Sequence, residues 1–107
     1  MYMVTETWWP TNKGAELGKV YLESMKKFPN DKSLVKAIVP SAMWATKEGM
    51  HGISIYSIKP GKVKEAMDIE TNRNLMLSFV EGYVFATHIA CDLVEAMPFV
   101  GLAAPTD

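Results

Sequence analysis

The sequence predicts an α+β fold with the element order βαββαβ and a four-stranded antiparallel sheet. Three observations predict it: runs of β-branched and aromatic residues, two long segments rich in helix-forming residues, and Pro or Gly residues between them. The expected strands are residues 2–9, 38–46, 50–58 and 83–91. The expected helices are residues 12–28 and 62–80.

Each boundary has a local cause. Pro10 ends the first strand, and the helix after it carries apolar residues at helical spacing, namely Leu17, Tyr21, Met25 and Phe28. The turn at 47–49 contains Gly49 and predicts a hairpin between the second and third strands. Pro40 cannot donate to a sheet ladder, so the second strand is expected at an edge. Gly82 ends the second helix.

Right-handed connections in both βαβ units give the ferredoxin-like plait, with the first strand in the centre and both helices on one face. The strands carry large apolar side chains on both faces, but two helices can cover only one. A second copy of the sheet is the economical cover, so we expect a homodimer that pairs as a dimeric α/β barrel. The whole chain, 1–107, is expected to form one domain with an apolar C-terminal tail at 92–107.

Composition excludes several classes of protein. The net charge is −1 and charged residues make up 21% of the chain without a basic stripe, so a nucleic-acid partner is not expected. A single cysteine, Cys91, cannot form an internal disulfide and favours a cytoplasmic location. No segment has the roughly 18 apolar residues of a membrane span. His51 and His88 lie toward opposite ends of the expected sheet, so neither a metal site nor a cofactor is expected.

The order of elements, the two-sided strands and the apolar tail resemble the dimeric α/β barrel superfamily over residues 2–91. In architecture the chain is similar to small cofactor-independent monooxygenases and to stress-responsive barrel proteins. The resemblance implies oxidation or isomerisation of a small aromatic or quinone-like compound. Fold alone does not define chemistry, so activity has to be argued from residues.

Six residues are the candidates for a ligand site. Trp9, Tyr21 and His51 are expected to line a pocket beneath the helices, with Trp9 and His51 as near neighbours on adjacent strands. The polar edge of this pocket is expected to be formed by Glu70, Arg73 and Asn74. The alternative is ordinary core packing, with Arg73 lying along the core edge and its charged head in water.

Glu6 and His51 are the candidate catalytic residues. A carboxylate in a central strand is a candidate general base because burial would raise its pKa, but Glu6 could equally be paired in a dimer interface. Two functions therefore stay open. The chain either binds and transforms a small aromatic or apolar molecule, as a monooxygenase or isomerase would, or it is a non-catalytic binding protein or structural homodimer.

Overall fold

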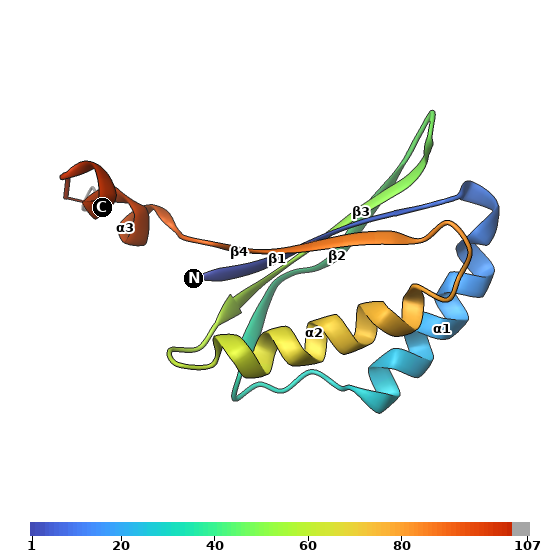
Figure 1. Cartoon of the computed structure of the whole chain (residues 1–107), viewed down its shortest axis with the longest axis horizontal. Coiled ribbons are helices and arrows are strands. Elements are labelled where there is room, and N and C mark those ends of the chain that lie inside the picture. The colour runs from blue at the N-terminus through green and yellow to red at the C-terminus, as the bar shows by residue number, and fades with distance from the viewer. Residues whose placement is uncertain (104–107) are drawn as a thin grey trace.

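The computed structural model describes residues 1–103 and confirms the predicted α+β order (Figure 1). The strands are β1 (Tyr2–Trp9), β2 (Val35–Thr46), β3 (Gly49–Ile58) and β4 (Val84–Ala90). The helices are α1 (Gly14–Lys27), α2 (Val63–Leu77) and the short α3 (Leu93–Ala96). The 3-10 turns η1 (Thr11–Lys13) and η2 (Met97–Val100) precede α1 and follow α3. The last four residues of the expected tail, 104–107, lie outside the described residues.

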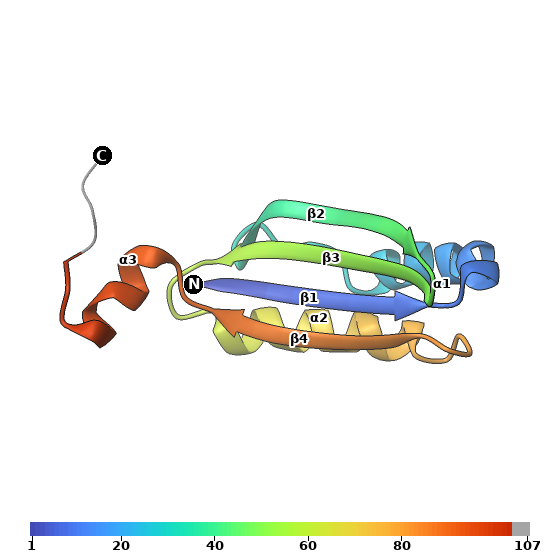
Figure 2. The same ribbon diagram turned by 90° about the horizontal axis from the view of Figure 1, so that it is seen from above.

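The sheet is antiparallel in the order β2-β3-β1-β4, so β1 is central and β2 is an edge strand, as the position of Pro40 predicted. Helices α1 and α2 lie together on one face (Figure 1). Seen from the other side, the four strands lie open in front of the helices (Figure 2). We call this uncovered side the outer face. None of the helices in residues 1–103 is long and apolar enough to cross a membrane.

Three boundaries differ from the prediction by two or three residues, and the others by at most one. Helix α1 begins at Gly14 rather than at residue 12 because the preceding residues form the 3-10 turn η1. Strand β2 begins at Val35, three residues early, because its pairing with β3 continues to Ile58. Helix α2 ends at Leu77 rather than at residue 80 because residues 78–80 form a turn. In this turn the Val80 N–H donates to the Leu77 carbonyl.

The core beneath the sheet consists of two apolar clusters with a polar layer between them. One cluster contains Trp9, Leu17, Leu77, Val80 and Tyr83, and the other contains Met3, Tyr56, Ile58 and Ala66. The polar layer consists of Thr5, Glu70, Arg73 and Asn74, all of which are buried. Along β1 it falls between Met3 and Trp9, and along α2 it falls between Ala66 and Leu77.

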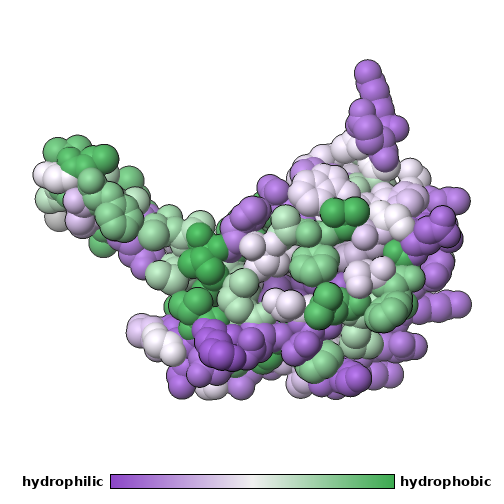
Figure 3. All heavy atoms as spheres, in the orientation of Figure 1, coloured by the Kyte–Doolittle hydropathy of each residue, from purple (hydrophilic) through white to green (hydrophobic). Residues whose placement is uncertain are grey.

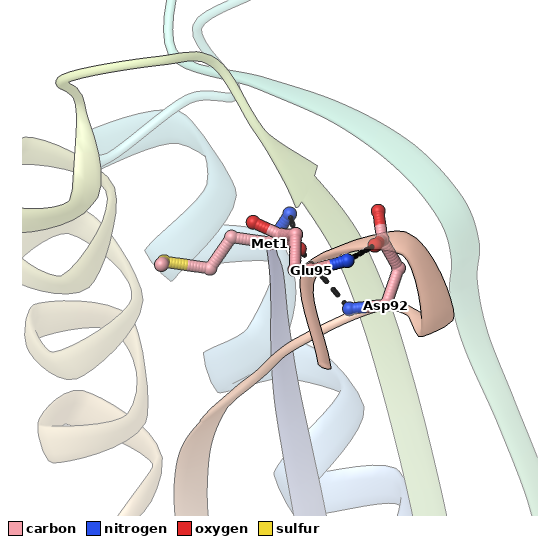
Figure 4. Close-up of polar contacts among 3 residues, drawn as sticks. All are labelled: Met1, Asp92 and Glu95. Carbon is pink, nitrogen blue, oxygen red and sulfur yellow. Dashed lines mark hydrogen bonds and ion pairs between the residues drawn. The ribbon is translucent and has the colours of Figure 1, made fainter. Parts of the chain in front are cut away.

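Residues 93–102 form an arm that projects from the end of the sheet next to the N-terminus (Figures 1 and 2). Asp92 and Glu95 form a reciprocal capping box at the start of α3. Glu95 Oε1 also forms an ion pair with the amino nitrogen of Met1 at 2.6 Å, and this pair ties the arm to β1 (Figure 4). Apolar side chains cover the arm (Figure 3), and the exposed ones are Leu93, Val94, Phe99, Val100 and Leu102.

The turn from α2 to β4 gives a test of the fold. Gly82 has φ +86°, and a Cβ added there would lie 2.5 and 2.8 Å from ring atoms of Pro10. Gly61 has φ +74° with open space around it, so it serves as the control. In urea unfolding, Gly61→Ala should lower the free energy of unfolding by about 1–2 kcal/mol, because alanine is strained in a left-handed backbone conformation. Gly82→Ala should cost a further ~1–3 kcal/mol because it also overpacks the turn against Pro10. Equal losses would contradict this packing.

Candidate functional site

A cavity of about 400 Å³ lies between the sheet and the two helices. Its walls are mostly apolar, with Trp9, Leu17, Met50 and Leu77 among them. The opening lies between α1 and the edge strand β2, because Tyr21 of α1 and Met43 of β2 line the cavity and are 41% and 55% exposed. The cavity volume is within the range of small-molecule sites, roughly 300–1,000 Å³.

The closed end of the cavity is the polar layer. Glu70, Arg73, Asn74 and Leu77 follow at i, i+3, i+4 and i+7 on α2, so all four face the sheet. The Thr5 hydroxyl donates to Glu70 Oε2 at 3.0 Å, and Asn74 Nδ2 donates to Glu70 Oε1 at 3.3 Å. The Tyr83 hydroxyl donates to Asn74 Oδ1. Glu70 is therefore held in one orientation by neutral donors.

Burial raises the pKa of Glu70, and the hydrogen bond from Thr5 and the charge of Arg73 offset the rise only in part. Glu70 is 6% exposed and is the only carboxylate lining the cavity in the part of the chain that the structure describes. A buried carboxylate with a raised pKa is suited to accept a proton near neutral pH. It is the best-placed proton acceptor in this site.

Arg73 is also only 6% exposed. Its guanidinium is therefore buried, whereas the core-packing alternative expected it to lie in water. Its Nε donates to the Phe28 carbonyl at 2.6 Å, at the C-terminal end of α1. Its Nη2 is buried and has no hydrogen-bond partner. Burial raises the pKa of the neighbouring Tyr56 hydroxyl, which also lines the cavity.

Of the six expected ligand-site residues, the structure brings five to this cavity: Trp9, Tyr21, Glu70, Arg73 and Asn74. His51 is not among them, and the prediction that its side chain shares a face with that of Trp9 was wrong. Trp9 pairs with Met50, whereas His51 pairs with Trp8. A difference of one residue in register moves a side chain to the opposite face of the sheet.

His51 lies instead on the outer face between two tryptophans. Its ring stacks on Trp8 with centroids 4.9 Å apart and tilts against Trp44 at 4.5 Å. Its Nε2 is buried without a partner. Glu6 is half-buried on the same face, opposite Ile53 of β3 and Ala86 of β4. Neither weak catalytic candidate reaches the cavity.

Other cavity residues were not named as site candidates from the sequence, among them Thr5, Thr7, Tyr56 and Tyr83. Thr5, Thr7 and Trp9 alternate along β1, so the choice of Trp9 as a lining residue also implied the two threonines. The two tyrosines are buried by contacts between distant segments and carry no local signal. Among residues 1–103, no group of three or more His, Cys, Asp or Glu side chains is placed to hold a metal ion.

Comparison with known proteins supports the fold. No family model matches the chain, and no curated protein matches it. A solved structure from Caulobacter crescentus CB15, whose proposed activity is that of an antibiotic biosynthesis monooxygenase, superposes with a TM-score of 0.50. The match covers 85% of this chain and 90% of that one at 18% identity. The chain thus shares its ferredoxin-like architecture with this solved structure, as the sequence predicted, and the likeness concerns the fold alone.

The buried carboxylate makes stability depend on pH. The folded-state pKa of Glu70 lies above its unfolded value, about 4.3. Protonated Glu70 therefore adds to the free energy of unfolding, and this contribution is complete at a pH below the unfolded pKa. It is lost as the pH rises through the raised folded pKa. We expect Glu70→Gln to gain stability over the wild type as the pH rises from about 4 to 8. Urea unfolding at one protein concentration measures this, and a constant difference would contradict it.

Proposed function

We propose that each protomer binds one small, flat, apolar or aromatic molecule in the cavity between sheet and helices. The observation that carries this proposal is the cavity itself, an apolar space of about 400 Å³ with a few fixed polar groups at its closed end. Sites for small ligands have this composition. The free and exposed Cys91 is compatible with a reducing compartment, so we propose a cytoplasmic location.

The chemistry that this site favours begins with a proton transfer. A bound molecule with an acidic C–H or O–H would give its proton to Glu70. An isomerisation can start with that step, and so can a cofactor-independent oxidation in which molecular oxygen is the electron acceptor. The architecture shared with a proposed monooxygenase supports a monooxygenase-like or isomerase-like enzyme. The alternative is a binding protein in which Glu70 serves only to orient the ligand. Recovery of the bound molecule unchanged would favour that alternative.

Filling the cavity tests the proposal. Gly18 lines the cavity, and a Cβ added there meets no atom within 4 Å. A glycine inside a helix costs about 1 kcal/mol relative to Ala, so Gly18→Phe should not unfold the protein. We expect it to weaken the binding of 2-naphthamide, a neutral flat probe, by at least about tenfold in calorimetry, or about 1.4 kcal/mol.

Lys19→Phe is the matched control because Lys19 is exposed and is not among the cavity residues. It adds the same ring to the neighbouring position and should leave binding unchanged. Equal effects of the two substitutions, or no binding of the probe to the wild type, would refute the site.

We propose further that the outer face pairs with that of a second copy, giving the homodimer expected from the sequence. Trp8 and Trp44 are 38% and 45% exposed there. The arm supports this partner because its apolar side chains point into solvent in the isolated protomer. Its α3 packs against η2, and its ion pair to Met1 holds it at the end of the sheet. A second sheet placed on the outer face would give the arm a surface to cover.

Light scattering at micromolar concentration should give twice the chain mass of 11.9 kDa. Phe99→Glu should shift the protein toward the monomer, because burial of a Phe side chain contributes about 1.5–3 kcal/mol at each arm. That corresponds to at least about a tenfold weaker dimer. Phe79→Glu is the control, since Phe79 is even more exposed than Phe99, at 91% against 80%, and comes two residues after α2, whose C-terminal end lies away from the arm (Figure 1). A wild-type monomer, or equal shifts, would contradict the dimer.

A further inference from the structure

The starting observation is a buried cation with no carboxylate in direct contact. Among residues 1–103, no carboxylate lies within 4.0 Å of the Arg73 guanidinium, although Glu70 is one turn away on the same helix. The Phe28 carbonyl accepts from Nε, but a neutral carbonyl does not balance a full charge. Buried ions in proteins are normally paired, because an isolated charge in an apolar interior is strongly unfavourable.

The guanidinium also has an unused donor. Nη2 is buried and makes no hydrogen bond, and arginine donors are suited to carboxylate oxygens. Arg73 borders two spaces, the large cavity and a hollow of about 10 Å³ that is also lined by Asp31 and Leu34. The hollow is too small for more than one water molecule. An organic anion that meets Arg73 must therefore come from the large cavity.

The other walls restrict the anion further. Apolar side chains line most of the cavity, so a small inorganic anion would leave them against empty space. Glu70 lies at the same closed end, and its negative form would oppose a ligand with two charges. The remaining class is a molecule with one negative charge and a flat apolar body.

We propose that the ligand is an aromatic monocarboxylate whose carboxylate accepts a hydrogen bond from Arg73 and whose ring occupies the apolar part of the cavity. This inference rests on the proposed small-molecule site and adds the class of ligand. Arg73 is then the residue that selects an anion. The apolar walls, with Trp9, Tyr21 and Leu77, select the shape of the ring system.

The test compares two probes of nearly the same shape on the full-length wild-type protein by calorimetry near neutral pH. One is 2-naphthoate, with an anionic carboxylate, and the other is 2-naphthamide, with a neutral amide. We expect 2-naphthoate to bind at least about tenfold more tightly, since a charge-assisted hydrogen bond is stronger than a neutral one. Equal binding of both probes would overturn the ligand class but leave the proposed site intact. Binding of neither probe would overturn the proposed site itself.

Arg73→Met keeps most of the side-chain stem and removes the charge, so it should abolish the preference for 2-naphthoate. Lys64→Met is the matched control. It removes one positive charge from the exposed side of the same helix, where Lys64 pairs with Asp68, and should keep the preference. A preference that survives Arg73→Met, or is lost equally in the control, would overturn the role of Arg73. If Arg73→Met does not fold, the wild-type comparison still decides the ligand class.

Discussion

The hydrogen bond from Thr5 to Glu70 joins the central strand to α2 in the middle of the core, and much of the structure depends on it. Thr5 also meets the Thr87 hydroxyl of β4 at 3.0 Å, so one side chain connects three elements. A fully apolar core would let helices and sheet close on each other. Here the polar layer divides the core into two clusters and keeps polar groups facing an open space. The four residues of the polar layer all line the cavity.

Much of this arrangement follows from the sequence, because helical spacing is a strong local signal. The i, i+3, i+4 and i+7 positions of Glu70, Arg73, Asn74 and Leu77 predict a shared face before any contact is known. Pro40 likewise predicts an edge strand from its own chemistry. The order of elements and the central position of β1 follow from the rules of chain connection rather than from any motif.

Strand register and depth of burial could not be predicted in the same way. Both faces of β3 carry apolar groups, so alternation does not reveal whether Met50 or His51 faces the helices, and the choice of His51 was wrong. The pairing of Trp9 with Met50 joins strands that are distant in the sequence, whereas the turn at Gly49 connects β3 only to β2. The burial of Arg73 is equally non-local. Nothing within α2 shows that the end of α1 would bring the Phe28 carbonyl to its guanidinium.

The ion pair between the Met1 amino group and Glu95 has a practical consequence for handling this protein. The contact needs a free ammonium at the first residue, where it ties the start of β1 to α3 (Figure 4). A purification tag or acetyl group attached there replaces that ammonium with a neutral amide. The arm would then keep its capping box but lose its charged anchor. An affinity tag placed after Asp107 leaves this ammonium chemically intact.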